Sequence, residues 1–83
     1  MEAKKFDGKA AGALFQVLQH KRELFTGMSD EKLARYLADL WRLRDTNPRT
    51  YENIGGPSEK NRIYEIAGTR PEIITLARKL WKG

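Results

Sequence analysis

The chain has 83 residues, of which 40% are hydrophobic, and a net charge of +5. It has no cysteine and a single histidine, His20; this excludes disulfides, thiolate catalysis and zinc sites built from cysteines or paired histidines, and we expect no cofactor, metal or catalytic site. No stretch approaches the roughly 18 apolar residues of a membrane span, and no apolar run follows the charged N-terminus, so we expect a cytoplasmic protein with no membrane partner.

A single small domain is expected over residues 1–83, with a loose tail at 1–6. The first predicted element is an amphipathic helix over 9–25, with Asp7 as its N-cap and Gly27 as a left-handed stop. Its apolar positions recur with helical spacing and predict a buried stripe. They are Ala10, Leu14, Val17, Leu18, Leu24 and Phe25.

A second amphipathic helix is predicted over 30–44, because Ser29 is a suitable N-cap and acidic residues occupy the first turn. The helix should end just before Asn47-Pro48. The short link Thr26–Met28 predicts that the first two helices form an antiparallel hairpin. Five apolar residues form the buried stripe of this helix. They are Leu33, Tyr36, Leu37, Leu40 and Trp41.

The next segment has two interpretations. Arg49–Ile54 fits a short helical turn that begins with Asn47-Pro48, and it fits a short strand equally well. Ser58–Ala67 fits a helix with Ser58 as cap and Gly68 as stop, and it also fits the second strand of a hairpin. The positions of the cap and the stop favour the helix.

The last predicted helix runs over 71–82. Thr69-Arg70-Pro71-Glu72 has the form of a capping box with proline in the first turn. Its predicted buried stripe comprises Ile73, Ile74, Ala77, Leu80 and Trp81. The predicted fold is therefore mostly α, a bundle of three or four helices. The alternative is an α+β fold, with two N-terminal helices, a short β-hairpin around 50–67 and a C-terminal helix.

The segment Gly68-Thr69-Arg70-Pro71-Glu72 resembles the opening signature of the UDP-N-acetylglucosamine 2-epimerases. In that family the signature joins the first strand to the first helix and faces the nucleotide, so the resemblance implies a strand at 62–67. It covers five residues of this chain, whereas the family's fold requires several hundred residues and catalytic groups in two domains. We therefore carry over no epimerase activity and keep only the strand alternative.

Positive charge is concentrated in the second half of the chain. Residues 1–41 contain seven Lys or Arg and six Asp or Glu, whereas residues 42–83 contain nine and five. Excess positive charge attracts phosphate backbones through a long-range, salt-sensitive interaction. This distribution favours DNA or another nucleic acid as a partner.

A helix-turn-helix arrangement over 60–77 is one way to use that charge. Ile63, Ala67, Ile74 and Ala77 fall at its buried positions, whereas Tyr64 and Thr69 depart from its usual residue types. An ordinary core hairpin of helices explains the same pattern. The residues expected to contact nucleic acid are Arg49, Lys60, Arg62, Arg70, Thr75, Arg78, Lys79 and Lys82.

Other features remain open to more than one interpretation. Arg42 and Arg44 suit a phosphate or acidic partner, or simply the negative end of a helix dipole. Glu23 follows His20 by three residues, which predicts a surface pair. Four aromatic residues at helical spacing (Tyr36, Trp41, Tyr64 and Trp81) are expected in the core or at its edge and not as a stacking platform. The alternative to nucleic-acid binding is a protein-interaction module, a small regulatory subunit or a homodimer.

Overall fold

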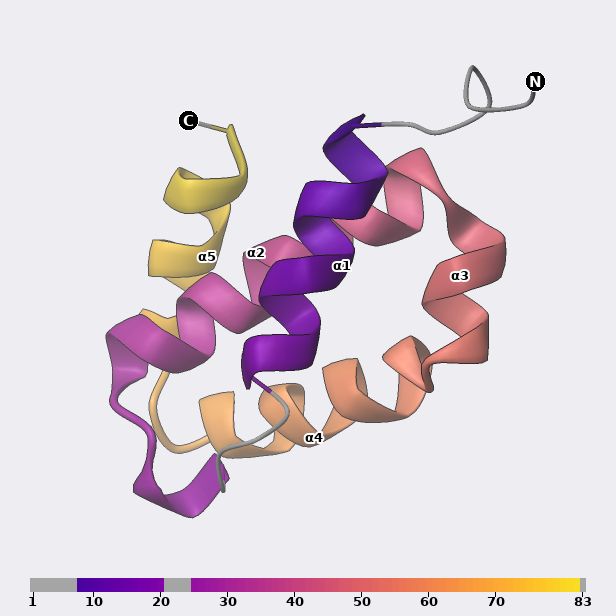
Figure 1. Ribbon diagram of the computed structural model, residues 1–83. Coiled ribbons are helices and arrows are strands. Elements are labelled where there is room, and N and C mark those ends of the chain that lie inside the picture. The colour runs from indigo at the N-terminus through magenta and orange to yellow at the C-terminus, as the bar shows by residue number, and fades with distance from the viewer. Residues whose placement is uncertain (1–7, 21–24, 83) are drawn as a thin grey trace, which may run out of the picture.

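Helices account for nearly all of the computed structural model, which describes residues 8–20 and 25–82. In chain order they are α1 (Gly8–His20), the 3-10 turn η2 (Phe25–Gly27), α2 (Asp30–Thr46), α3 (Pro48–Asn53), α4 (Gly56–Ala67) and α5 (Glu72–Lys82) (Figure 1). The prediction of a mostly α domain is confirmed. The β-hairpin alternative is wrong, because residues 50–67 form α3 and α4. The expected tail at 1–6, the Asp7 cap and Leu24 lie outside the described residues.

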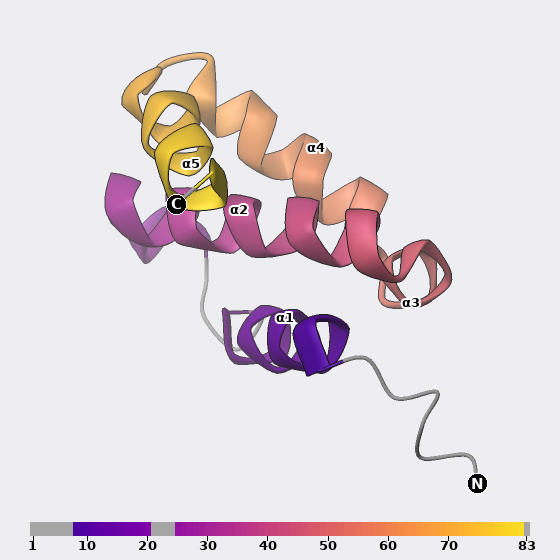
Figure 2. The same cartoon turned by 90° about the horizontal axis from the view of Figure 1, so that it is seen from above.

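Helix α2 is the centre of the domain. Figure 2 shows α1 on one side of it and α4 and α5 on the other. All five residues of its predicted stripe are buried, and so are Ala34, Ala38, Asp39 and Leu43, so apolar contacts surround the helix on most of its circumference. A helix buried on so many faces must be apolar over more than one stripe, which is why α2 carries the largest share of the core.

Local hydrogen bonds determine where α2 and α3 begin. The Ser29 hydroxyl accepts from the Lys32 N–H at 3.1 Å, which confirms the predicted cap of α2. Asn47 has two functions: its N–H donates to the Leu43 carbonyl at the end of α2, and its side-chain oxygen accepts from Thr50 N–H at 3.1 Å at the start of α3. Pro48 occupies the first turn of α3, where its missing N–H costs nothing. The helical interpretation of this segment is confirmed.

The start of α4 differs from the prediction. The helix begins at Gly56, two residues before Ser58, and its N-cap is Gly55 in the left-handed region with φ 77°. Ser58 therefore lies inside the first turn and caps nothing. Gly56 is also a steric requirement, because a Cβ there would lie 2.4 Å from the Tyr51 ring. The chain turns between α3 and α4 through backbone geometry that only glycine adopts readily.

Gly27 does not adopt the left-handed conformation predicted for it; Gly55 is the one positive-φ residue in the described chain. Gly68 is the C-cap of α4, which confirms the predicted end of that helix, although its backbone is in the right-handed region. The expected capping box at 69–72 does not appear: the Thr69 hydroxyl donates to the Ile66 carbonyl at 3.1 Å, and the N–H groups of Ile73 and Ile74 donate to the carbonyls of Arg70 and Pro71. Thr69 thus contacts the end of α4, and α5 begins at Glu72, directly after Pro71.

Helix α1 packs on α2 through a face that coincides only in part with the predicted stripe. Val17 is buried and Leu14 packs against the core as expected. Leu18, however, is 47% exposed, and Ala13 and His20 are buried instead. Phe25 belongs to η2 and not to the first helix. Figure 2 shows α1 nearly end-on while α2 runs across the view, so the two helices cross obliquely. The two helices are neighbours as expected, and Figure 1 shows them running in opposite overall directions, as predicted.

Candidate functional site

A pocket with aromatic and basic walls opens where α2, α4 and α5 meet. Its volume is about 400 Å³. The lining residues come from all three helices and comprise three aromatic rings and three cations. They are Trp41, Arg44, Tyr64, Arg78, Trp81 and Lys82, which we call the aromatic–basic pocket. No carboxylate lines it, so its walls combine apolar ring surface with positive charge.

The three rings of the pocket hold one another in place. Trp41 is buried and donates its indole N–H to the Tyr64 hydroxyl at 3.2 Å. It also packs edge-to-face against Trp81, with ring centroids 5.5 Å apart. Tyr64 and Trp81 are 40% and 37% exposed, which places them at the rim. Tyr64 and Trp81 therefore lie at the edge of the core, as predicted. Trp81 does not, however, belong to the buried stripe expected for α5.

The cations of the pocket differ in how far they are neutralised. Arg44 lies 3.4 Å from Asp45, and both side chains are more than a third exposed, so water screens this pair. Arg78 and Lys82 are exposed and pair with no carboxylate among the described residues. Lys60 lies over the Tyr64 ring, 5.7 Å from its centroid, and adds a fourth positive charge next to the pocket.

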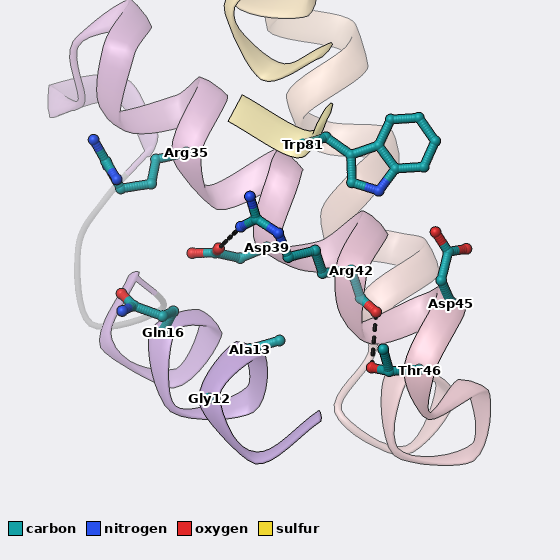
Figure 3. Close-up of a pocket in the computed structure, with 9 residues that line it drawn as sticks. All are labelled: Gly12, Ala13, Gln16, Arg35, Asp39, Arg42, Asp45, Thr46 and Trp81. Carbon is teal, nitrogen blue, oxygen red and sulfur yellow. Dashed lines mark hydrogen bonds and ion pairs between the residues drawn. The ribbon is translucent and has the colours of Figure 1, made fainter. Parts of the chain in front are cut away.

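A second, larger groove of about 550 Å³ adjoins this pocket between α1, α2 and α5 (Figure 3). Trp81 lines both. The walls of the groove carry mixed charge and come mainly from α1 and α2. They comprise Gly12, Ala13, Gln16, Arg35, Asp39, Arg42, Asp45, Thr46 and Trp81.

The charges of that groove hold helices together. Asp39 is buried on α2 and accepts from Arg42 at 3.1 Å. The same guanidinium donates to the Leu80 carbonyl on α5. On the other side of Asp39, His20 Nε2 of α1 donates to the carboxylate at 3.2 Å, and its ring stacks on Tyr36. One carboxylate thus links three helices, so Arg42 is committed to a structural contact.

His20 therefore has a partner that the sequence pattern did not identify. The predicted pair with Glu23 lies outside the described residues. A usable signal existed in the spacing of α2, because Asp39 follows the buried Tyr36 by three residues and must border the same face.

Two buried tyrosines have contrasting surroundings. The Tyr36 hydroxyl donates a hydrogen bond to the Glu59 carboxylate on α4 at 3.0 Å. Burial, reinforced by the negative charge of Glu59, raises the pKa of Tyr36 well above its ordinary value. The Tyr51 hydroxyl is buried with no hydrogen-bond partner in the described chain. Burial also raises the pKa of Tyr51, and the charge of the nearby Arg44 opposes that increase.

The predicted nucleic-acid residues are not all brought together. Arg78 and Lys82 line the aromatic–basic pocket, and Lys60 lies beside it. Arg70 donates to Asp30 at 2.5 Å and to the Met28 carbonyl at 3.0 Å, so it ties the start of α5 to the start of α2. The remaining four are exposed but lie outside the pocket lining. They are Arg49, Arg62, Thr75 and Lys79.

The helix-turn-helix segment contains two helices joined by a tight turn, and Figure 2 shows them at a steep angle. Ile63, Ala67 and Ala77 are buried as expected. Ile73, and not Ile74, is the fully buried isoleucine of α5. Helix α5 packs mainly against α2 and less against α4, so α2 provides most of the support for the second helix of this segment.

The aromatic partners of this site were missed at the sequence level, and so was the place of Arg44 among them. Helical spacing contained the signal. Arg44 follows Trp41 by three residues, and Trp81 and Lys82 follow Arg78 by three and four, so each set shares a helix face. The spacing alone does not show that these two helix faces, one on α2 and one on α5, meet at Tyr64.

Comparison with known proteins adds no assignment: no protein family, curated protein or solved structure matches this chain. The predicted strand at 62–67, which the epimerase-like signature would require, is part of α4. None of the helices in the described segments has the length and apolar character needed to cross a bilayer. Within those segments, no group of three or more histidine and carboxylate side chains is placed to hold a metal ion.

Proposed function

We propose that this domain binds nucleic acid through the aromatic–basic pocket, in a non-catalytic role in the cytoplasm. The observation that carries the proposal is the composition of the pocket wall: Arg44, Arg78 and Lys82 surround exposed rings, and no carboxylate lines the opening. Cations placed around aromatic surface are the side chains that sequence-tolerant nucleic-acid sites use.

The charge distribution of the chain supports the same partner. Residues 42–83, which supply five of the six residues that line the pocket, contain nine Lys or Arg and five Asp or Glu. Phosphate contacts made by such residues release condensed counterions, and this release supplies most of the affinity in non-specific binding. The larger groove next to the pocket is a weaker candidate, because Asp39 neutralises Arg42 there.

A binding role also fits the chemistry of the pocket wall. The lining has no histidine, carboxylate, serine or threonine, and the Tyr64 hydroxyl accepts a hydrogen bond from Trp41. Acid–base or nucleophilic catalysis needs a paired proton acceptor within hydrogen-bond distance of the reacting group. Indole rings, guanidinium groups and an ammonium group instead supply contact area and charge.

The test measures binding of fluorescent oligonucleotides by anisotropy between about 50 and 200 mM salt, the range over which phosphate contacts lose most of their strength. We expect the logarithm of the association constant to fall linearly with the logarithm of the salt concentration. Arg78→Gln should weaken binding and reduce the slope by about 0.7 to 0.9, the value of one phosphate contact.

Arg35→Gln is the matched control, because Arg35 is an exposed arginine on α2 outside the aromatic–basic pocket. We expect it to change the affinity less than Arg78→Gln does. The absence of binding at the lowest salt concentration, or an affinity that does not respond to salt, would overturn the proposal.

A protein partner is the second candidate, and one observation favours it. Phe15 and Leu18 lie three residues apart on the outer face of α1 and are 61% and 47% exposed. Exposed apolar residues that share a helix face are typical of docking surfaces. Light scattering of the purified protein tests self-association. A native mass above that of the monomer, together with a monomer mass for Phe15→Ser, would support this function.

A further inference from the structure

We propose that the aromatic–basic pocket takes an unpaired nucleotide of a single strand, with its base stacked on Tyr64 or Trp81 and its phosphates held by Arg44, Arg78 and Lys82. This inference rests on the proposed function and narrows it to single-stranded nucleic acid.

The first argument is that the rim rings are exposed and yet rigidly placed. Tyr64 and Trp81 both contact the buried Trp41, one through a hydrogen bond and the other edge-to-face. A flexible exposed ring would lose side-chain entropy when it stacks on a ligand, whereas rings held in advance avoid this cost. Trp41 therefore acts as a positioning residue for two ring surfaces that face solvent.

The second argument is electrostatic. Three cations line the pocket together with the rings, and Lys60 lies over the Tyr64 ring from outside it. A ligand that fits must combine a flat π surface with negative charge a few ångströms away. A nucleotide has both groups, and successive nucleotides repeat them along the strand.

The third argument concerns the shape of the site. The rings lie in the wall and at the rim of a concavity, and not on a helix that projects from the surface. In a duplex the faces of the bases are stacked on one another, and only their edges reach the grooves. A base must therefore be unpaired and free of the stack to reach Tyr64 or Trp81. The neighbouring groove shares Trp81 but carries mixed charge, because Asp39 and Asp45 line it together with Arg35 and Arg42.

The experiment compares three probes of about ten nucleotides, within the usual footprint of single-strand sites. They are oligo-dT, an abasic strand with the same phosphates, and a mixed-sequence duplex of the same length. We expect oligo-dT to bind about 5- to 150-fold more tightly than the abasic strand, the effect of stacking one base. Oligo-dT should also quench tryptophan fluorescence, and the abasic strand should not.

Variants of the pocket separate stacking from charge. Tyr64→Leu and Trp81→Leu should reduce the oligo-dT affinity toward that of the abasic strand and leave the salt slope unchanged. Tyr64→Phe keeps the ring and removes the hydroxyl through which Trp41 holds it, so its preference for bases should fall between that of the native chain and that of Tyr64→Leu. Thermal unfolding by circular dichroism checks that each variant is folded, and Arg35→Gln serves as the charge control outside the pocket.

The outcomes distinguish this inference from the proposed function. Equal affinity for oligo-dT and the abasic strand would refute base stacking and leave charge-based binding intact. A duplex that binds as tightly as oligo-dT would refute the preference for a single strand. No binding to any of the three probes would refute both. Displacement of oligo-dT by an equal concentration of an acidic, tyrosine-containing peptide would overturn the inference in favour of a protein ligand.

Discussion

At the scale of single residues, Asp39 is the polar group on which the packing depends most. Its carboxylate is buried and contacts His20 of α1 and Arg42, which in turn reaches the Leu80 carbonyl of α5. A buried acid of this kind is stable only while its partners satisfy it. Removing the acid leaves two donors without their acceptor, one of them buried.

We therefore expect Asp39→Ala to lower the free energy of unfolding by about 2 to 3 kcal/mol, the effect of losing hydrogen bonds to a charged group. Chemical denaturation measures this. Asp45→Ala is the control: Asp45 is half exposed and pairs with Arg44 at 3.4 Å, so its removal should cost at most a few tenths of a kcal/mol. Equal losses in the two variants would contradict the structural role of Asp39.

The two buried tyrosines provide a matched pair. Tyr36→Phe removes a hydroxyl that donates to Glu59, and we expect a loss of about 1 kcal/mol. Tyr51→Phe removes a buried hydroxyl that has no partner among the described residues, so its stability should be unchanged or higher. Urea unfolding of both variants checks the sign. A larger loss for Tyr51→Phe than for Tyr36→Phe would show that the hydroxyl of Tyr51 is satisfied in solution.

Burial of Tyr36 also predicts how stability depends on pH. Its pKa in the folded state is raised above the ordinary value of 10.0. The unfolded chain therefore loses the tyrosine proton first as the pH rises through about 10, and this stabilises the unfolded state. The stability that protonated Tyr36 contributes to the folded state is fully present below about pH 10 and is lost as the pH rises further.

We expect the urea midpoint of the native chain to fall as the pH rises above about 10, and to fall less in Tyr36→Phe, which has no proton to lose at that position. All other titratable groups are the same in both proteins, so the difference between the two profiles isolates the tyrosine. Parallel profiles would contradict the raised pKa.

At the scale of elements, the junction between α3 and α4 depends on two adjacent glycines. Gly55 adopts a left-handed conformation, and Gly56 packs its Cα against Tyr51. The backbone carbonyl of Tyr51 would lie 2.7 Å from a Cβ at position 56, and a carbonyl in the main chain cannot move aside as a side chain can. This junction sets the direction in which α4 leaves α3, and hence where Tyr64 meets α2 and α5.

Gly56→Ala should therefore destabilise the domain by about 1 to 3 kcal/mol, the usual cost of overpacking. Gly12→Ala is the opposite case: Gly12 lies within α1, and nothing stands within 4 Å of the position a Cβ would take. Alanine there should stabilise the helix by about 0.5 to 1 kcal/mol. Thermal unfolding of the two variants should show shifts of opposite sign, and a destabilised Gly12→Ala would contradict the placement of α1.

At the scale of the whole molecule, we expect the proposed binding to be coupled to folding. The aromatic–basic pocket is assembled from α2, α4 and α5, so it exists only in the folded domain. A ligand that binds the folded state and not the unfolded state raises stability according to its concentration relative to its dissociation constant. This holds whichever residues make the contacts.

An oligo-dT concentration of about 100 times the dissociation constant should raise the free energy of unfolding by about 2.7 kcal/mol and increase the melting temperature accordingly. The abasic strand at the same concentration should raise it less. A melting temperature that oligo-dT leaves unchanged, at a concentration where anisotropy reports saturation, would mean that binding does not require the folded pocket.

Much of the fold could be predicted because it depends on contacts between residues close in the chain. The stripe of α2, the caps at Ser29 and Asn47 and the position of Pro48 are all set within one or two turns of helix. Predictions that depended on a single glycine or threonine were less secure. Gly27 does not take the left-handed conformation that a helix stop favours, and the Thr69 hydroxyl bonds back to α4 and not forward to α5.

The candidate site could be predicted only in part, for the same physical reason. The basic character of residues 42–83 and the shared helix faces of Arg78 and Lys82 follow from the sequence. Tyr64 approaches Trp41 across 23 residues of chain, and Arg70 reaches Asp30 across 40. Contacts at such separations leave no periodic pattern.

The amino-acid sequence alone thus determined a small, mostly α domain with a basic second half, because helical periodicity, capping and net charge are local or additive properties. The tertiary structure decided which charges are neutralised and which stay exposed. Arg42 and Arg70 became structural, whereas Arg78 and Lys82 came to lie beside two exposed rings. That division depends on how α5 and α4 pack on α2, and it arises only once the buried faces of all three helices have met.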